Sequence, residues 1–189
     1  MKLRVLIAGA GIGGLAAALA CRQRGCAVTV LEAAAEFGEV GAGIQLGPNA
    51  MKVLAAVGLE AEVLRVASLP QAILIADSRS GKPISRMLLG DAARQRYGQV
   101  YITIHRADLH GILLRAAGAA GVQLLANQML QKYEQTAQEV CALVGDFSHH
   151  ADILVGADGL WSRVRGQLLG DGAPRATGHA AFRCIVDDA

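Results

Sequence analysis

Three glycines and one acid near the N-terminus have the types and spacing of a dinucleotide site. Gly9, Gly11 and Gly14 form the pattern Gly-x-Gly-x-x-Gly, and Glu32 follows about 20 residues later. The first glycine of such a pattern permits a tight turn, the second lets the backbone approach a pyrophosphate, and the third lets a helix pack on a strand. A carboxylate at Glu32 can accept hydrogen bonds from ribose hydroxyls, which favours FAD or NAD over a 2′-phosphate. This first unit does not distinguish FAD from NAD.

The residues around this pattern predict the elements that hold it. The apolar run 3–8 predicts a buried strand, residues 15–24 a helix that ends before Gly25, and residues 27–31 a second strand. The phosphates would then lie at the helix N-terminus, where free N–H groups and the helix dipole favour negative charge. We therefore expect Ile12 and Gly13, in the same turn, to bind the cofactor with the three glycines.

Further along the chain the patterns predict more strands and helices around a long glycine-rich loop. Turns are expected at 136–138 and 145–146, and His149 and His150 are expected in a turn exposed to solvent. The loop covers residues 37–48. The expected strands cover 71–77, 84–89, 101–104, 122–130, 131–135, 139–144, 153–155 and 179–186, and the expected helices cover 49–57, 107–117 and 162–169.

A second glycine–acid motif follows the buried run 153–155. Asp158 and Gly159 come directly after this run, at the end of a strand where α/β proteins bind their ligands. With Ser162 and Arg165 they form Asp-Gly-x-x-Ser-x-x-Arg, which resembles the Asp-Gly motif of the flavoprotein aromatic hydroxylases, the family of p-hydroxybenzoate and salicylate hydroxylases. The resemblance implies that Asp158 and Gly159 lie near the FAD ribose and pyrophosphate, while Ser162 and Arg165 maintain the shape of the motif.

Three more stretches resemble the salicylate-hydroxylase branch, namely 38–49, 96–109 and 181–183. The resemblance implies that Arg106 contacts the phosphate and ribityl region of FAD, and a guanidinium at a helix start can pair with phosphate. An ordinary exposed arginine at a helix start remains the alternative for Arg106. The predicted cofactor-binding residues are Gly9, Gly11, Ile12, Gly13, Gly14, Glu32, Arg106, Leu130, Asp158 and Gly159.

The family's third motif, Gly-Asp followed by Ala-Ala-His and a later proline, has no counterpart here. The similar stretch 88–94 precedes the Asp-Gly motif and carries Arg94 in place of the histidine. We therefore expect a fragment that lacks a C-terminal portion, with an independent small nucleotide-binding protein as the alternative.

The resemblance implies an FAD-dependent monooxygenase in which NADH or NADPH is the reductant and oxygen supplies a hydroxyl group to an aromatic acid such as a hydroxybenzoate or salicylate-like compound. Two alternatives remain: a non-catalytic module that binds FAD or an adenine dinucleotide, and an NAD-dependent dehydrogenase domain. No residue is assigned as the catalytic base. Structural roles are favoured for His105 and for the packing residue Trp161.

These observations predict an α/β chain with a Rossmann-like FAD/NAD(P)-binding fold, made of a central parallel sheet, helices and a β-meander, with partial strands of a substrate-domain sheet. The FAD-binding domain is expected over 1–70 and 101–177, and incomplete pieces of a substrate-binding domain over 71–100 and 178–189.

Composition excludes other classes of function. Apolar residues make up 53% of the 189 residues and the net charge is +2, so the chain has a core and no basic footprint for nucleic acid. No apolar run reaches the ~18–20 residues of a membrane span, and the glycines near the N-terminus argue against a signal peptide. Four cysteines without zinc-site spacing (Cys21, Cys26, Cys141 and Cys184) favour a reduced cytoplasm and predict no metal site. A homodimer is left open.

Overall fold

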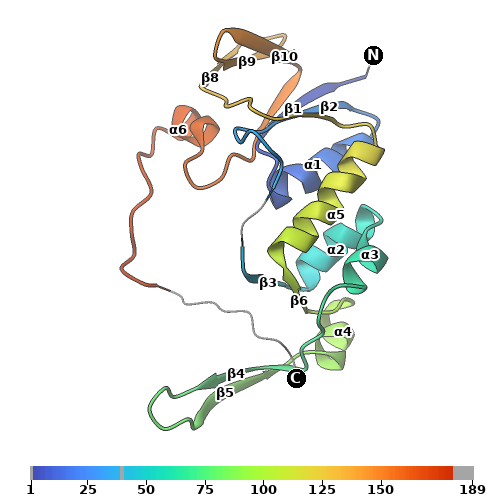
Figure 1. Cartoon of the computed structure of the whole chain (residues 1–189), viewed down its shortest axis with the longest axis vertical. Coiled ribbons are helices and arrows are strands. Elements are labelled where there is room, and N and C mark those ends of the chain that lie inside the picture. The colour runs from blue at the N-terminus through green and yellow to red at the C-terminus, as the bar shows by residue number, and fades with distance from the viewer. Residues whose placement is uncertain (1, 39–40, 181–189) are drawn as a thin grey trace. The chain divides into compact units, whose positions relative to one another are not determined.

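The computed structural model describes residues 2–38 and 41–180 (Figure 1). The chain divides into two compact units, the first made of Met1–Glu39 and His110–Phe182 and the second of Val40–Leu109 and Arg183–Ala189. These divisions fall at other positions than the predicted domain boundaries, and the assignment of residues to an FAD-binding and a substrate-binding domain remains a prediction.

The first unit is built on a parallel sheet of four strands. They are β1 (Arg4–Ala8), β2 (Ala27–Leu31), β7 (Gln123–Leu125) and β11 (Ile153–Gly156), in the order β11-β1-β2-β7. Ala8 is in register with Leu31 on one side and with Gly156 on the other, so three strands end at the same edge. The last four residues of β1 are buried, as its continuous apolar run predicts.

Helix α1 (Ile12–Gln23) joins β1 to β2 and packs against both of them (Figure 1). It begins at Ile12, earlier than the predicted Leu15, because the turn after β1 is tight enough for residues 12–14 to form the first helical turn. Gly25 follows the helix with φ of 81°, a left-handed conformation that glycine adopts without strain. The expected strand, helix and strand at the start of the chain are confirmed.

A β-meander follows β7, made of β8 (Lys132–Gln135), β9 (Val140–Val144) and β10 (Phe147–Ala151) in antiparallel order β10-β9-β8. Val140, Ala142 and Val144 face a core that they share with Leu6 and Leu31 of the parallel sheet. Because successive residues of a strand face opposite sides, the residues between them, such as Cys141, lie on the outer face.

Two predictions in this region are wrong. His149 and His150 lie in strand β10, since residues 147–151 pair with β9 along their whole length. The expected single strand 122–130 ends at Leu125, and Asn127 with φ of 54° breaks the extended conformation there. Helix α6 (Arg163–Leu169) is the last helix of the described residues in this unit and lies close to the predicted bounds.

In the second unit, β3 (Gly43–Leu46) pairs with β6 (Ile102–His105), and β4 (Ala72–Ala76) forms the expected hairpin with β5 (Pro83–Leu88). Its helices are α2 (Pro48–Ala56), α3 (Glu60–Leu64) and α4 (Asp91–Tyr97). Helix α5 (Arg106–Ala119) begins in this unit and continues into the first. Strand β3 was expected as loop, because its pairing with β6 is not visible in a run of four residues. The expected strand 179–186 falls almost entirely outside the described residues.

Candidate functional site

The carboxyl ends of β1, β2 and β11 bring the two glycine motifs together. The Gly9 N–H donates to the Leu31 carbonyl at 2.7 Å, and the Ala157 N–H donates to the Ala8 carbonyl at 2.8 Å. A Cβ atom on Gly9 would lie 3.1 Å from the Cα of Asp158. The loop after β1 and the loop after β11 are therefore in direct contact, at the edge of the sheet where open α/β sheets bind ligands.

Glycine is required at two positions of the first loop by the closeness of the backbone. Gly9 has φ of 102°, and a Cβ there would stand 2.3 Å from the Ala157 carbonyl oxygen. A Cβ on Gly14 would stand 1.9 Å from the Gly9 carbonyl oxygen. The first and third glycines thus permit the tight turn and the close packing of α1 that the pattern predicts.

The N-terminus of α1 is open to a ligand. Gly11 precedes the helix as its N-cap, and within the described residues no side chain caps it. Gly13 is exposed, with no heavy atom within 4 Å of where its Cβ would be. Uncapped N–H groups in a helical first turn, next to glycines without side chains, fit the charge and the width of a diphosphate.

Glu32 follows β2, and its carboxylate binds the backbone of the glycine loop. Its Oε2 accepts a hydrogen bond from the Ala10 N–H at 2.7 Å, and its Oε1 accepts one from the Ala34 N–H at 2.9 Å. Each carboxylate oxygen can accept a further hydrogen bond, because it carries two lone pairs. Glu32 is therefore oriented by the backbone and keeps the capacity to accept ribose hydroxyls.

His110 fixes the same loop from α5, a role that the sequence did not reveal. Its side chain is buried, and its Nε2 lies 2.8 Å from the carbonyl oxygen of Ala10, 100 residues away in sequence. Since a carbonyl oxygen only accepts, Nε2 carries the proton. Ala10 is thus held through its N–H by Glu32 and through its carbonyl by His110, which positions the middle of the glycine loop.

The Asp158 carboxylate is directed into helix α6. Its Oδ1 accepts from the Ser162 hydroxyl at 2.5 Å, and its Oδ2 accepts from the N–H groups of Arg163 and Val164 at 2.7 and 3.2 Å. Ser162 is the N-cap of α6 and accepts from the Arg165 N–H. Asp158 and Ser162 therefore shape the loop together, and a cofactor would meet the backbone of this motif more readily than the carboxylate.

The other predicted residues lie in different surroundings. Gly159 is exposed, with φ of 76°. Leu130 is buried in the core between the sheet and the β-meander, so only its backbone is available to a cofactor. Arg106 belongs to the second unit, where its side chain packs on Gly41 and its N–H donates to the Ala42 carbonyl. Binding of a cofactor by these three residues stays a prediction.

A pocket of about 490 Å³ lies beside α6, lined among others by Trp161, Arg165 and Gln167. Arg165 forms an ion pair with Asp171 at its rim. The glycine loop does not contribute to this pocket, which is therefore distinct from the edge of the sheet where the two glycine motifs meet.

The described part of the chain has neither a candidate metal site nor a candidate membrane span. No group of three or more His, Cys, Asp or Glu side chains there could hold a metal ion. No helix in residues 2–38 and 41–180 has the length and apolar character to cross a membrane.

Known proteins are similar to this chain in sequence and in fold. The chain is 42% identical to 3-hydroxybenzoate 6-hydroxylase 1 of Aquipseudomonas alcaligenes over 98% of its length and 48% of the relative. It is 38% identical to 6-hydroxynicotinate 3-monooxygenase of Bordetella bronchiseptica over 97% of its length and 48% of that relative. The chain thus spans about half the length of the curated relatives it matches.

Solved structures have a fold similar to that of this chain. A structure of HpxO from Klebsiella pneumoniae in complex with FAD matches 89% of this chain and 43% of its own, with a TM-score of 0.77 and 30% identity. A tetrameric form of 2-methyl-3-hydroxypyridine-5-carboxylic acid oxygenase covers 89% of this chain and 42% of its own, with a TM-score of 0.77 and 28% identity. The expected Rossmann-like fold and the expected FAD cofactor are confirmed. Residues 2–180 match the FAD binding domain, and the chain belongs to this family.

Proposed function

We propose that this chain holds the adenosine diphosphate part of FAD across the ends of β1, β2 and β11, as part of an NAD(P)H-dependent monooxygenase that hydroxylates an aromatic acid. The observation that carries the proposal is the meeting of the glycine loop, Glu32 and the Ala157–Asp158 loop at one edge of the parallel sheet. Such an edge combines hydrogen-bond donors for phosphate with an acceptor for ribose.

Each part of the edge has its own task in this proposal. The N–H groups at the start of α1 bind the diphosphate, and Glu32 accepts hydrogen bonds from the ribose hydroxyls. Glu32 and His110 keep Ala10 in place, so the donors of the loop are oriented before the cofactor arrives. FAD, once bound, supplies the redox and oxygen chemistry of the proposed hydroxylation.

The relatives support a substrate class. Their names specify 3-hydroxybenzoate, 6-hydroxynicotinate and 3-amino-4-hydroxybenzoate, all of which are aromatic carboxylates with a ring hydroxyl group. We therefore propose a hydroxylated aromatic acid as the substrate of the protein. NADH or NADPH as reductant, assembly as a dimer or higher oligomer, and a cytoplasmic location belong to the same proposal.

The first test is a titration of the purified chain with FAD, followed by flavin fluorescence, with NAD⁺ as the competing ligand. We expect saturable FAD binding that NAD⁺ does not prevent. Glu32→Gln should weaken it about tenfold or more, because a hydrogen bond to a charged acceptor contributes about 1.5–3 kcal/mol. Exposed Glu36 offers the matched control Glu36→Gln, which should bind FAD as the unchanged chain does.

Glu32 also accepts hydrogen bonds from the Ala10 and Ala34 N–H groups. A melting curve of Glu32→Gln must therefore be measured along with the titration. A folded chain that takes up no FAD, or a folded Glu32→Gln variant with full affinity, would contradict the proposed site. The activity is tested separately, by measuring oxidation of NADH and NADPH in the presence of FAD and a series of aromatic acids. We expect hydroxybenzoates or hydroxynicotinates to accelerate oxidation over benzoate, and equal rates with all acids would contradict the substrate class.

A further inference from the structure

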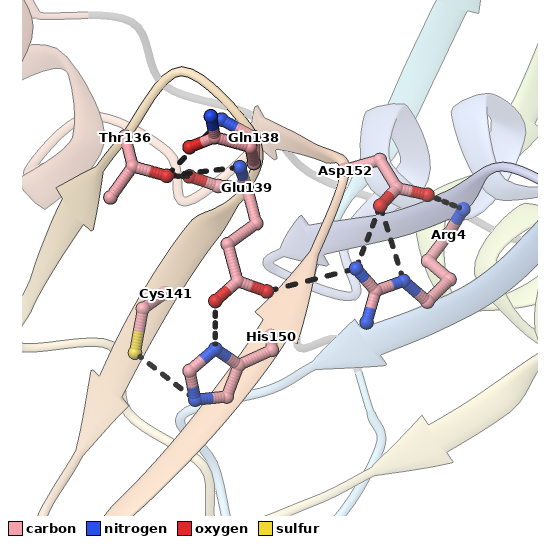
Figure 2. A network of polar contacts seen from close by, with 7 residues as sticks. All are labelled: Arg4, Thr136, Gln138, Glu139, Cys141, His150 and Asp152. Carbon is pink, nitrogen blue, oxygen red and sulfur yellow. Dashed lines mark hydrogen bonds and ion pairs between the residues drawn. The ribbon is translucent and has the colours of Figure 1, made fainter.

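A thiol, an imidazole and a carboxylate on the β-meander are connected in series by polar contacts (Figure 2). Cys141 on β9 and His150 on β10 are cross-strand partners, and the Cys141 Sγ lies 3.7 Å from the His150 Nε2. The other ring nitrogen of His150, Nδ1, lies 3.0 Å from the Glu139 Oε1. The proposed flavin site uses none of these three side chains.

Glu139 determines which nitrogen of His150 carries the proton. A carboxylate only accepts hydrogen bonds, so the contact at 3.0 Å requires the proton on Nδ1. In the neutral ring, Nε2 then presents its lone pair to Cys141. The thiol can donate to this lone pair and, on reaction, transfer its proton to it.

The position of Glu139 is itself fixed by its neighbours. The Thr136 hydroxyl accepts from the Gln138 and Glu139 N–H groups, both at 3.2 Å, which holds the turn before β9 (Figure 2). The Arg4 guanidinium lies 3.7 Å from the Glu139 Oε2, so the two carboxylate oxygens point to Arg4 and to His150.

Other charges surround the thiol. Arg4 is paired with Asp152 at 2.7 Å, which largely cancels its charge. On the other side of Cys141, Glu134 of β8 is its cross-strand partner, and Glu134 is paired with Lys132 at 3.2 Å. With both outer pairs balanced, His150 and Glu139 are the polar groups connected to the sulfur through the contacts above.

We infer that Cys141 is a nucleophilic thiol that reacts with hydrogen peroxide, with His150 as the base and Glu139 as a residue that positions it. The thiol proton passes to the His150 Nε2 and the sulfur attacks one peroxide oxygen, which breaks the O–O bond. The leaving hydroxide takes the proton back from the imidazolium, which leaves cysteine sulfenic acid and water. Sulfur loses the two electrons that the peroxide gains.

Two other cysteines of the same unit provide internal controls. Cys21 and Cys26 are free and partly buried, as Cys141 is. Burial raises the pKa of the Cys21 thiol, which disfavours its reactive thiolate form. Trypsin cleaves after Arg22, Lys52 and Arg163, among other sites, so the three cysteines are recovered in separate peptides.

The experiment measures alkylation of each cysteine in the folded chain by limiting iodoacetamide near neutral pH, with peptide mass spectrometry as the readout. A parallel sample receives one equivalent of hydrogen peroxide and then dimedone, which traps sulfenic acid. We expect Cys141 to alkylate at least about tenfold faster than Cys26, and to carry most of the dimedone, because His150 can take up the thiol proton as the sulfur reacts. Equal rates and equal dimedone labelling of Cys141 and Cys26 would overturn the inference.

Substitutions of His150 and of Glu139 distinguish the role of the base from the role of the residue that positions it. His150→Gln should lower the Cys141 rate about tenfold and displace its pH profile to higher pH, since glutamine cannot accept the proton. Glu139→Gln should give a smaller loss, about threefold, with a pH profile between the other two. Gln138→Ala is the matched control in the same turn and should leave rate and profile unchanged.

The rate of Cys21 labelling shows whether the chain is folded in each sample. If Cys21 labelling stays slow in His150→Gln while the Cys141 rate and pH profile match those of the unchanged chain, the role of His150 is refuted. If Cys21 labelling rises sharply, the variant has unfolded, and the ratio of Cys141 to Cys26 in the unchanged chain decides the question.

Discussion

Substitution of Gly14 by alanine tests the packing that makes the glycine loop. A Cβ at this position would stand 1.9 Å from the Gly9 carbonyl oxygen, where ordinary contacts begin at 3.4 Å, and 3.3 Å from the Ala157 Cβ. The clash is with backbone, so no side chain can rotate away. Helix α1 would have to move from the ends of β1 and β11 by about 1 Å or more, and overpacking against backbone to this extent costs about 3 kcal/mol or more.

Alanine also favours a helix over glycine by up to about 1 kcal/mol, which offsets part of this cost. We therefore expect Gly14→Ala to lower the free energy of unfolding by about 2 kcal/mol or more. For a chain of this size the melting temperature should fall by roughly 4–8 °C. Urea unfolding followed by circular dichroism, without added FAD, gives the free energy from the midpoint and slope.

Gly13→Ala is the matched control, because it makes the same change in the same helical turn. No heavy atom lies within 4 Å of the new Cβ, so stability should be unchanged or rise by up to about 1 kcal/mol. If the two variants unfold at the same urea concentration, the reasoning from close packing is refuted.

Three further predictions concern single hydrogen-bonded groups. The hydrogen bonds and charge of Arg4 lower the pKa of Asp152 from its ordinary 3.8, so this pair stabilises the fold above that pH and ceases to do so as the pH falls below it. The difference in melting temperature between the unchanged chain and Asp152→Asn should therefore close as the pH falls below about 4, and a constant difference would contradict the pairing. Asp158→Ala should lower the free energy of unfolding by about 1 kcal/mol, because the N–H groups of Arg163 and Val164 in the first turn of α6 lose their acceptor, as urea unfolding would measure. His110→Phe leaves the buried Ala10 carbonyl oxygen without its donor, so we expect a loss of about 1–3 kcal/mol in stability together with weaker FAD binding by titration, and normal values for both would exclude its positioning role.

Much of the fold follows from local patterns. The apolar run of β1, the glycine turn and the Ala-rich helix that follows it are contiguous, so their periodicity and spacing predict strand, turn and helix directly. The strand before Asp158 and the helix after it were predicted in the same way. Where two residues must pair over a distance to define an element, as in β3 with β6 or His150 with Cys141, the prediction failed.

The sequence by itself determined which residues make up the proposed site: glycines for a phosphate loop, an acid proposed to accept ribose hydroxyls, and a second Asp-Gly motif after a buried strand. Only the tertiary structure decided that the Asp158 carboxylate turns into α6, that His110 holds Ala10, and that Cys141 and His150 meet on the β-meander. Backbone conformation depends mainly on neighbours in sequence, whereas the partner of a side chain depends on strand register and helix packing. Strand register and helix packing depend on burial of the whole core, so the spacing of residues far apart in the chain does not reveal them.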